Sequence, residues 1–333
     1  MNIPGWIRRA RRLSLSILAV LLVLAAAGAL YQTVSVRRES GRFPPPGRLV
    51  DVGGRRLHLI CIGEGRPTVI FESSGLGGAL SSPAARTEIG AQTRVCSYDR
   101  MGLGWSDPGP ATVSVGTLAD DLERLLDGAG LRPPYILVPS SIGGLTVELF
   151  ARRHPERVAG LVFLDAADSG ALERIVPRLT ATVRAEACLL PIAARLGIVR
   201  LLDPFGFRRE RSDAANRSMA RLYRVEPMAT VCGIARGTAT SLQELRAAPP
   251  FAADVPFAVL TAQTSAGLVP PGLDVDLAVL ERERLEQQRS LSRRSSRGTW
   301  HVVPGSDHLI GNSQPHAVAA AVLEMLSQVR RSS

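Results

Sequence analysis

The feature that most constrains the fold of this 333-residue chain is an alternation of short apolar runs with longer segments of helical spacing. Residues 68–72 (TVIFE), 135–138 and 158–164 are apolar runs of strand length, whereas residues 115–129 repeat their leucines at helical intervals. Short strands that alternate with helices form a mostly parallel sheet with helices on both faces. The sequence therefore predicts an α/β protein.

Other segments extend this pattern to eight strands along residues 49–333. Residues 50–52 and 55–62 flank Gly53 and Gly54, which is typical of a β-hairpin. Further strands are expected at 94–98, 256–261 and 300–303, and further helices at 79–91, 145–154, 277–291 and 315–329. Residues 170–250, after the sixth strand, are rich in Arg, Ala and Leu and helical in pattern. We interpret that insertion as a helical cap over the site.

Residues 13–31 are predicted to form a transmembrane helix. They contain no charged side chain over 19 positions, and a helix of that length spans about 28 Å, close to the thickness of a bilayer core. The flanking basic residues are Arg8, Arg9, Arg11 and Arg12 before the segment and Arg37 and Arg38 after it. This asymmetry predicts a cytoplasmic tail at residues 1–12 and a body outside the cytoplasm, in a single-pass membrane protein.

A cleaved signal peptide is the alternative interpretation of the same segment. The small residues at 25–29 could be cut, and the body would then be secreted. Residues 32–48 end in GRFPPPGR and are expected to form a stiff, Pro-rich linker to one domain at 49–333.

The net charge of +10 arises mainly from the N-terminus. All 40 basic residues are arginine, and residues 1–48 contain eight of them against one acid, Glu39. The remaining 285 residues carry 32 arginines against 29 acids. A nucleic-acid-binding domain concentrates basic charge on its folded body. We therefore expect no nucleic-acid partner.

Ser141 is the candidate nucleophile. It follows the expected strand at 135–138 and precedes a helix, with Gly143 two positions later. A sharp strand-to-helix turn holds a nucleophile in a strained backbone conformation and needs small neighbours, and the helix start directs free N–H groups toward an anion. Pro139 replaces the first glycine of the usual G-x-S-x-G motif, and Ser140 is the competing serine.

Two backbone N–H groups are expected to bind the oxyanion that forms when Ser141 attacks a carbonyl carbon. Residues 73–78 form a Ser- and Gly-rich loop after a buried strand, and this loop can present the Leu76 N–H toward the serine. The Ile142 N–H is the second expected donor. Such donors stabilise a tetrahedral intermediate, and removing one in a well-studied enzyme costs about 3–4 kcal/mol of barrier.

His308 is the candidate general base. It follows the last expected strand, where a loop can reach the serine. The other four histidines lie in the hairpin, at helix ends or within a strand: His58, His154, His301 and His316.

A carboxylate must orient the imidazole of His308. Asp165, directly after the strand at 158–164, is the first choice. Asp168, Asp274 and Asp276 remain alternatives, because no acid follows the strand at 256–261 closely.

The order of elbow serine, acid and histidine resembles the α/β-hydrolase fold. Residues 93–110 (TRVCSYDRMGLGWSDPGP) look like the loop after the fourth strand in the esterase, peptidase and haloperoxidase-like branches of that superfamily. PERVAGLVFLDAA and GSDHLIGNSQPHAV look like later landmarks. The resemblance covers about residues 49–333. It implies an eight-stranded α/β-hydrolase sheet with a cap after strand 6, a Ser–His–acid triad, no cofactor and no metal.

The family resemblance also bears on the acid and on the activity. Many members place the acid after the seventh strand, and some lipase-like members place it after the sixth, where Asp165 stands. The resemblance implies a serine hydrolase that cleaves an ester or amide carbonyl of a small acyl substrate through an acyl-enzyme, with carboxylic ester hydrolysis as the first expectation. The predicted transmembrane helix at residues 13–31 would tether this hydrolase to a membrane. A catalytically inactive binding module is the alternative, because Pro139 and the missing late acid depart from the pattern. Haloperoxidase-type activity is a third interpretation.

The four cysteines have no metal-ligand spacing. In the fold that the chain resembles, the strands of Cys61 and Cys96 are neighbours, and Cys188 and Cys232 share the cap. Two disulfides could therefore form outside the cytoplasm. We expect buried thiols at Cys61 and Cys96 and leave the state of Cys188 and Cys232 open.

Overall fold

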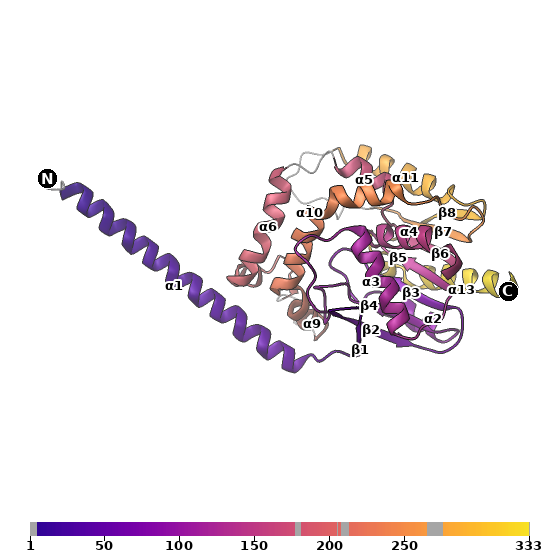
Figure 1. The fold of residues 1–333 in the computed structure, drawn as a ribbon, viewed down its shortest axis with the longest axis horizontal. Helices are drawn as coiled ribbons and strands as arrows, with labels where there is room; N and C mark the ends of the chain where they lie inside the picture. The colour runs from indigo at the N-terminus through magenta and orange to yellow at the C-terminus, as the bar shows by residue number, and fades with distance from the viewer. Residues whose placement is uncertain (1–4, 177–180, 205, 208–212, 265–275, 333) are drawn as a thin grey trace.

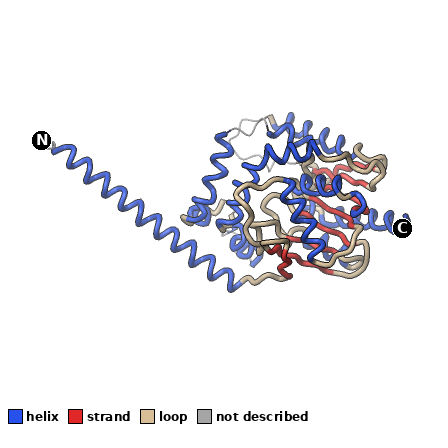
Figure 2. Tube along the Cα trace, in the orientation of Figure 1, coloured by secondary structure: helices blue, strands red, loops and turns tan. Residues whose placement is uncertain are grey.

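The computed structural model describes residues 5–176, 181–204, 206–207, 213–264 and 276–332. Its centre is one sheet with helices on both sides (Figure 1 and Figure 2). The strands are β1 (Arg48–Asp51), β2 (Arg56–Ile62), β3 (Thr68–Glu72), β4 (Val95–Tyr98), β5 (Tyr135–Pro139), β6 (Val158–Leu164), β7 (Phe257–Ala262) and β8 (Gly298–Val303). The helices of the body are α2 (Pro83–Gly90), α3 (Val115–Gly128), α4 (Gly143–Arg153), η1 (Pro155–Arg157), α11 (Leu277–Ser292), α12 (Ile310–Ser313) and α13 (Pro315–Ser332).

The sheet has eight strands and is mostly parallel, which confirms the sequence prediction. Its order is β1-β2-β4-β3-β5-β6-β7-β8, with antiparallel pairing from β1 to β4 and parallel pairing from β4 to β8. Gly53 and Gly54 turn the chain between β1 and β2, both with a φ of 87° that disfavours a side chain. The loops after β3, β5, β6 and β8 meet at one edge, because parallel strands end on the same side.

The side chains of β5 show how the sheet separates two apolar cores. Ile136 and Val138 join the core beneath α2 and α13, whereas Tyr135 and Leu137 join the core beneath α3 and α4. All four side chains are 0% exposed. Each large apolar side chain removed from water contributes about 1.5–3 kcal/mol. The two cores therefore hold the strand ends, and the loops that follow them, in fixed positions.

The cap lies between β6 and β7 and is helical in its described parts. Its helices are α5 (Ser169–Ile175), α6 (Ala181–Arg195), α7 (Ile198–Leu202), α9 (Asp213–Leu222) and α10 (Val225–Ala247). The disulfide between Cys188 and Cys232 joins α6 to α10, and α10 also packs against α3 of the body. The predicted insertion of helices after the sixth strand is therefore present.

The chain differs from the sequence prediction near its N-terminus. The prediction of a linker is wrong for residues 32–42, because these residues continue the long helix α1 (Gly5–Arg42). No proline occurs in α1, and Pro44 is the first residue that breaks the helical pattern. The nonhelical connection is thus limited to the few residues between α1 and β1.

Polar contacts dock the end of α1 on the cap, beside α6 and α9 (Figure 1). The Gln32 side chain donates to the Tyr223 carbonyl at 2.7 Å, and Arg200 donates to Gln32 Oε1 at 3.0 Å. Arg200 also forms an ion pair with Glu39, with Nη2 2.9 Å from Oε2. Arg200 is buried. These long-range partners explain why this segment is helical and packed, since a free linker would have none.

The prediction of free thiols is wrong for Cys61 and Cys96, which form a disulfide with their Cα atoms 4.1 Å apart. The two residues are direct partners in the antiparallel pair of β2 and β4. Opposing Cα atoms in such a ladder lie about 4.5–5.5 Å apart. The strand register therefore brings the two sulfur atoms together. The Cys188–Cys232 bridge, which the sequence left open, is also formed.

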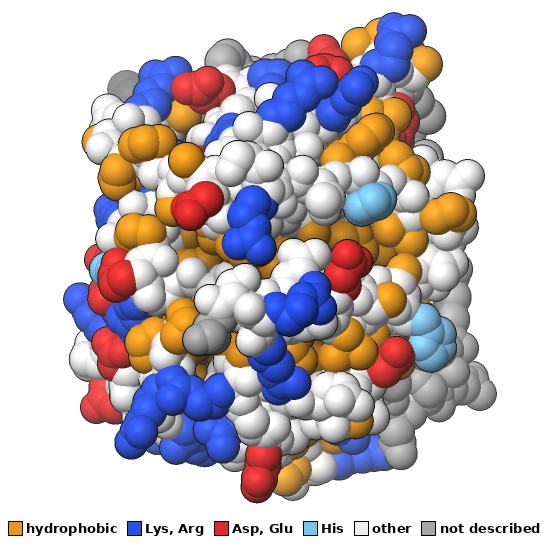
Figure 3. Space-filling view, turned by 90° about the vertical axis from the view of Figure 1, so that its right-hand side faces the viewer, with side chains coloured by type: hydrophobic (Ala, Val, Ile, Leu, Met, Phe, Trp, Pro, Cys, Tyr) orange, Lys and Arg blue, Asp and Glu red, His pale blue; other side chains and the backbone are white. Residues whose placement is uncertain are grey.

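Charged side chains are mixed on the molecular face drawn in Figure 3. Arginine side chains lie among acidic and apolar side chains across this face. This pattern agrees with the near balance of 32 arginines and 29 acids in residues 49–333.

Candidate active site

Ser141 lies in a sharp turn between β5 and α4, and its φ is 52°. This left-handed value is strained for a residue with a side chain. The backbone around it is tightly packed. A Cβ at Gly143 would lie 2.7 Å from Glu72 Cγ, and a Cβ at Gly144 would lie 2.1 Å from the Ala167 carbonyl oxygen. The turn therefore requires glycine at both positions.

Pro139 ends β5 without disturbing this turn. It pairs with Glu72 of β3 in the parallel register, and the Ser140 N–H donates to the Glu72 carbonyl at 2.9 Å. The continuous pairing of β5 with β6 ends at Leu137, so Pro139 removes no N–H from that ladder. Within the described chain, Ser141 contacts a histidine side chain and Ser140 does not.

Three loops bring Ser141, His308 and Asp165 together at the edge of the sheet. Ser141 follows β5, Asp165 follows β6, and His308 lies in the loop after β8. His308 Nε2 is 2.8 Å from Ser141 Oγ, and His308 Nδ1 is 2.7 Å from Asp165 Oδ2. The three residues selected from the sequence thus form one continuous chain of hydroxyl, imidazole and carboxylate.

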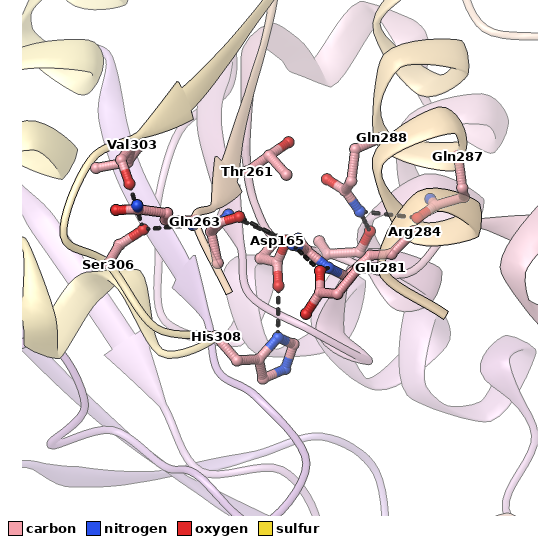
Figure 4. A network of polar contacts seen from close by, with 12 residues as sticks. Asp165, Thr261, Gln263, Glu281, Arg284, Gln287, Gln288, Val303, Ser306 and His308 are labelled. Carbon is pink, nitrogen blue, oxygen red and sulfur yellow. Dashed lines mark hydrogen bonds and ion pairs between the residues drawn. The ribbon is translucent and has the colours of Figure 1, made fainter. Parts of the chain in front are cut away.

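Asp165 is held from a second side by Arg284 of α11 (Figure 4). Arg284 forms an ion pair with Asp165 Oδ1 and donates to the Ala262 carbonyl at 2.9 Å. The Ala262 N–H also donates to Asp165 Oδ1, at 3.2 Å. Glu281 accepts a bond from Arg284 at 2.6 Å and offsets part of its charge. The scaffold therefore fixes one carboxylate oxygen while the other faces His308.

Sequence reasoning missed Arg284, which comes 119 residues after Asp165. Helix α11 contains several arginines and glutamates, so its charge pattern does not distinguish one arginine from the others. The position beside Asp165 follows from the packing of α11 against β7. No local sequence signal could have found it.

The other described candidate acids have different partners, and Asp168 forms an ion pair with Arg294. Asp168 accepts a backbone N–H at 2.8 Å at the start of α5, and Asp276 accepts one at 2.9 Å at the start of α11. Asp274 lies outside the described residues. Of the described candidates, Asp165 alone contacts His308.

The N–H groups of Leu76 and Ile142 donate no hydrogen bond within the described parts of the chain. Leu76 lies in the loop after β3, and Ile142 follows the serine at the start of α4. Free backbone donors at a helix start favour an anion. Both amides are therefore available to an oxyanion.

A buried ion pair supports the loop that carries Leu76, and sequence reasoning missed its acid. Glu72 at the end of β3 is 1% exposed and lies 3.0 Å from Arg100. Arg100 also donates to the carbonyls of Ser74, at 2.7 Å, and Gly75. Burial raises the pKa of Glu72, and the charge of Arg100 opposes that rise. The ion pair therefore holds this loop in position.

A cavity of about 550 Å³ opens beside this loop. Much of its lining is apolar and comes from both the body and the cap: Leu76, Leu164, Phe207, Leu222 and Leu309, with Ser140 among the polar groups. Such a lining suits an apolar group of a ligand beside Ser140, the neighbour of Ser141 in sequence. In the described residues, no group of three or more His, Cys, Asp or Glu side chains could hold a metal ion.

Comparison with known proteins identifies similar sequences and structures. Residues 67–229 match the family model for the alpha/beta hydrolase fold. An uncharacterised protein of Schizosaccharomyces pombe is 28% identical over 316 residues, which cover 82% of this chain and 54% of that protein. The 2-hydroxymuconate semialdehyde hydrolase of Pseudomonas putida is 33% identical over 123 residues, which cover 36% of this chain and 43% of that enzyme. The chain spans about half the length of the curated relatives it matches.

The overall structure is also similar to solved structures. The esterase of Thermogutta terrifontis, with malate bound, gives a TM-score of 0.61 at 22% identity. The match covers 85% of this chain and 98% of the esterase. At this level of identity the similarity concerns the fold.

Proposed function

Since the chain has the α/β-hydrolase fold, we propose that it is a membrane-tethered serine hydrolase that cleaves a carboxylic ester or amide through an acyl-enzyme intermediate. The observation that carries the proposal is the hydrogen-bonded chain from Ser141 through His308 to Asp165.

In the first step, Ser141 Oγ attacks the carbonyl carbon of the substrate while its proton moves to His308 Nε2. Asp165 accepts the Nδ1–H bond, so Nε2 is the unprotonated nitrogen that faces the serine. The carboxylate then stabilises the imidazolium. The electron pair of the C=O bond moves onto the oxygen, and the N–H groups of Leu76 and Ile142 bind this oxyanion.

In the second step, the tetrahedral intermediate loses the alcohol or amine, which takes the proton from His308. The acyl group remains on Ser141 Oγ. Water then gives a proton to His308 Nε2 and attacks the acyl carbon, and the serine leaves with that proton. The net reaction consumes one water and yields a carboxylic acid and an alcohol or amine. The cycle uses no cofactor.

A fluorophosphonate probe tests the proposal, because it reacts with an activated serine. We expect labelling of the unmodified chain and of Ser140→Ala, and loss of labelling in Ser141→Ala. Turnover of 4-nitrophenyl butyrate should fall by about 10⁴-fold or more in Ser141→Ala. A folded chain that resists the probe and turns over no ester would instead be a binding module.

The membrane part of the proposal places residues 13–31 of α1 across the bilayer. By length and composition α1 could span a membrane, with a mean hydropathy of 2.6 in a window whose side chains are not buried. The arginines before this segment favour a cytoplasmic N-terminus. The two disulfides agree with a catalytic domain outside the cytoplasm, where such bonds persist.

Contacts between α1 and the cap support the same placement. Gly28 packs so closely on α6 that a Cβ there would lie 2.2 Å from the Leu196 carbonyl oxygen. Apolar side chains on α6 and α7 are more than half exposed: Leu189, Ile192, Leu201 and Leu202. Exposed apolar groups next to a membrane-spanning helix suit the interface between headgroups and acyl chains.

Fractionation and mass analysis test the tether. We expect the full-length chain to stay in the membrane pellet after an alkaline carbonate wash. Protease added to the outside of intact spheroplasts should digest the body. If the mature chain begins after residues 25–29 and appears in the medium, the protein is secreted and the proposal of a membrane tether fails.

A further inference from the structure

Arg86 of α2 is a buried arginine whose charge no described carboxylate balances. It is 6% exposed, and Ser97 Oγ is the one hydrogen-bond partner of its guanidinium in the described chain. Its Nε is buried without a partner there. Burial lowers the pKa of Arg86, so the surroundings oppose its charge. A buried guanidinium normally lies beside an anion.

Arg86 lines a cavity of about 660 Å³ together with Arg217 and Arg221 of α9. We call it the basic cavity, because no acidic side chain occurs among the described residues that line it. Asp99 lies 3.2 Å from Arg221 and offsets that charge in part. Arg217 lies over the Phe43 ring, 5.9 Å from its centroid. The basic cavity therefore carries excess positive charge.

The basic cavity adjoins the candidate active site. It shares Leu76, Gly77 and Gly78 with the 550 Å³ cavity beside Ser140. Leu76 provides one of the two proposed oxyanion donors. A substrate whose carbonyl is bound at that donor can therefore extend toward the three arginines.

We infer that the basic cavity binds an anionic oxygen group, a carboxylate or a phosphate, carried by the ester substrate. The inference rests on the proposed hydrolase function and names its substrate class, which is esters with a negative charge a few bonds from the scissile carbonyl. The planar fork of arginine binds such groups through two parallel hydrogen bonds. A bound anion would balance the charge of Arg86, which no described carboxylate balances.

A kinetic test compares two 4-nitrophenyl esters of similar length, the hydrogen adipate, which has a terminal carboxylate, and the uncharged heptanoate. We expect a higher kcat/KM for the adipate ester. Arg86→Met should lower the ratio of the two kcat/KM values by about 10- to 100-fold, and Arg86→Lys should restore part of it. The control Arg153→Met removes a charge from the end of α4, where Arg153 pairs with Asp120, and should leave the ratio unchanged. A ratio that is equal in Arg86→Met and the unmodified chain overturns the inference.

Arg86→Met replaces a buried side chain, so circular dichroism must first show that the variant folds. If it does not fold, Arg217→Met takes its place, because Arg217 is exposed and outside the core. We expect the ratio to fall by about 3- to 10-fold in that variant. No change in a folded Arg217→Met chain would overturn the inference.

A binding measurement separates this inference from the hydrolase proposal. Sodium adipate and inorganic phosphate are titrated calorimetrically into the full-length Ser141→Ala chain at constant ionic strength. If the affinity for the anion falls about tenfold or more when Arg86→Met is added, the result supports binding in the basic cavity. The anion that binds more tightly shows whether the cavity prefers a carboxylate or a phosphate. If the anion binds but no serine reacts with the probe, the hydrolase proposal fails and the basic cavity stands. If esters are hydrolysed without charge preference and neither anion binds, the basic cavity fails and the hydrolase stands.

Discussion

Two histidine–aspartate pairs in this molecule share one geometry. His308 Nδ1 lies 2.7 Å from Asp165 Oδ2, and His58 Nδ1 lies 2.8 Å from Asp99 Oδ2. The side chains of His58 and Asp99 are fully buried, whereas the His308 side chain is 14% exposed. Each carboxylate is also held by an arginine and by backbone N–H donors, two for Asp99 and one for Asp165. The two pairs are therefore equivalent as hydrogen-bonded units.

The second nitrogen of the imidazole distinguishes the pairs. His308 Nε2 faces Ser141 Oγ at 2.8 Å, whereas His58 Nε2 accepts the Gly47 N–H at 3.2 Å. A hydroxyl can give up its proton and attack a carbonyl carbon, and a backbone amide cannot. A histidine oriented by a carboxylate can therefore act as a general base only where its second nitrogen faces a nucleophile. Elsewhere the same pair ties segments of chain together, here β2 to the loop after β4.

The largest difference between the pairs should appear in catalysis. His308→Gln should lower kcat/KM for 4-nitrophenyl butyrate by about 10⁴-fold or more, because no base remains to accept the Ser141 proton. Steady-state kinetics measures this loss. The free energy of unfolding in urea should fall by less than it does in His58→Gln, because the His308 side chain is 14% exposed whereas that of His58 is fully buried.

The matched control for this variant is His316→Gln. His316 is exposed and pairs with Glu88 on the surface of the body. The His316→Gln chain should retain nearly full activity. A His308→Gln chain that hydrolyses the ester as fast as His316→Gln would remove the basis for assigning different roles to the two pairs.

The buried pair should show the opposite behaviour, with a loss of stability. His58→Gln leaves Asp99 buried with one fewer strong donor, so the free energy of unfolding should fall by about 3 kcal/mol. Urea denaturation followed by fluorescence measures this change. Under conditions where both chains are folded, kcat should stay within about tenfold of the unmodified chain. A kcat loss as large as that of His308→Gln would show that His58 takes part in the reaction.

The sequence predicted one of these pairs because its signals are local. The elbow serine has Gly143 two positions later, His308 follows the last apolar run, and Asp165 follows another such run. Parallel strands bring those loops to one edge. The same reasoning predicted the sheet, since each strand is a short apolar run between helical segments.

Features that depend on tertiary contacts were not predictable in this way. His58 lies in the hairpin and meets Asp99 only after β2 and β4 pair. The Cys61–Cys96 bridge depends on that same register. The helical state of residues 32–42 depends on docking to the cap. In each case the partner is distant in sequence, so the local pattern of residues does not indicate the contact.

A smaller loss of activity is expected when the arginine beside Asp165 is replaced. Arg284 fixes Asp165 Oδ1, so Arg284→Met should lower kcat by about 10- to 100-fold with little change in KM, because the carboxylate orients the base and does not touch substrate. Arg284→Lys should recover part of the rate. The control is Arg282→Met, an exposed position on the same helix. If KM rose while kcat stayed constant, Arg284 would act in substrate binding and not in positioning Asp165.

The smallest predicted effect concerns acid stability. Burial opposes the charge of Asp99, but the hydrogen bond from His58 and the charge of Arg221 outweigh it, and the pKa of Asp99 lies below its ordinary value of 3.8. An aspartate with a lowered pKa adds stability that is fully present above its unfolded pKa and is lost as the pH falls through its folded pKa.

The stability advantage of the unmodified chain over His58→Gln should therefore shrink as the pH falls below about 4, where Asp99 takes up a proton first in the unfolded chain. Urea denaturation of both chains at several pH values measures the difference. Other buried carboxylates, including Glu72, are common to both chains and cancel. A difference that grew toward low pH would mean that the His58–Asp99 contact is not held by the charge of the carboxylate.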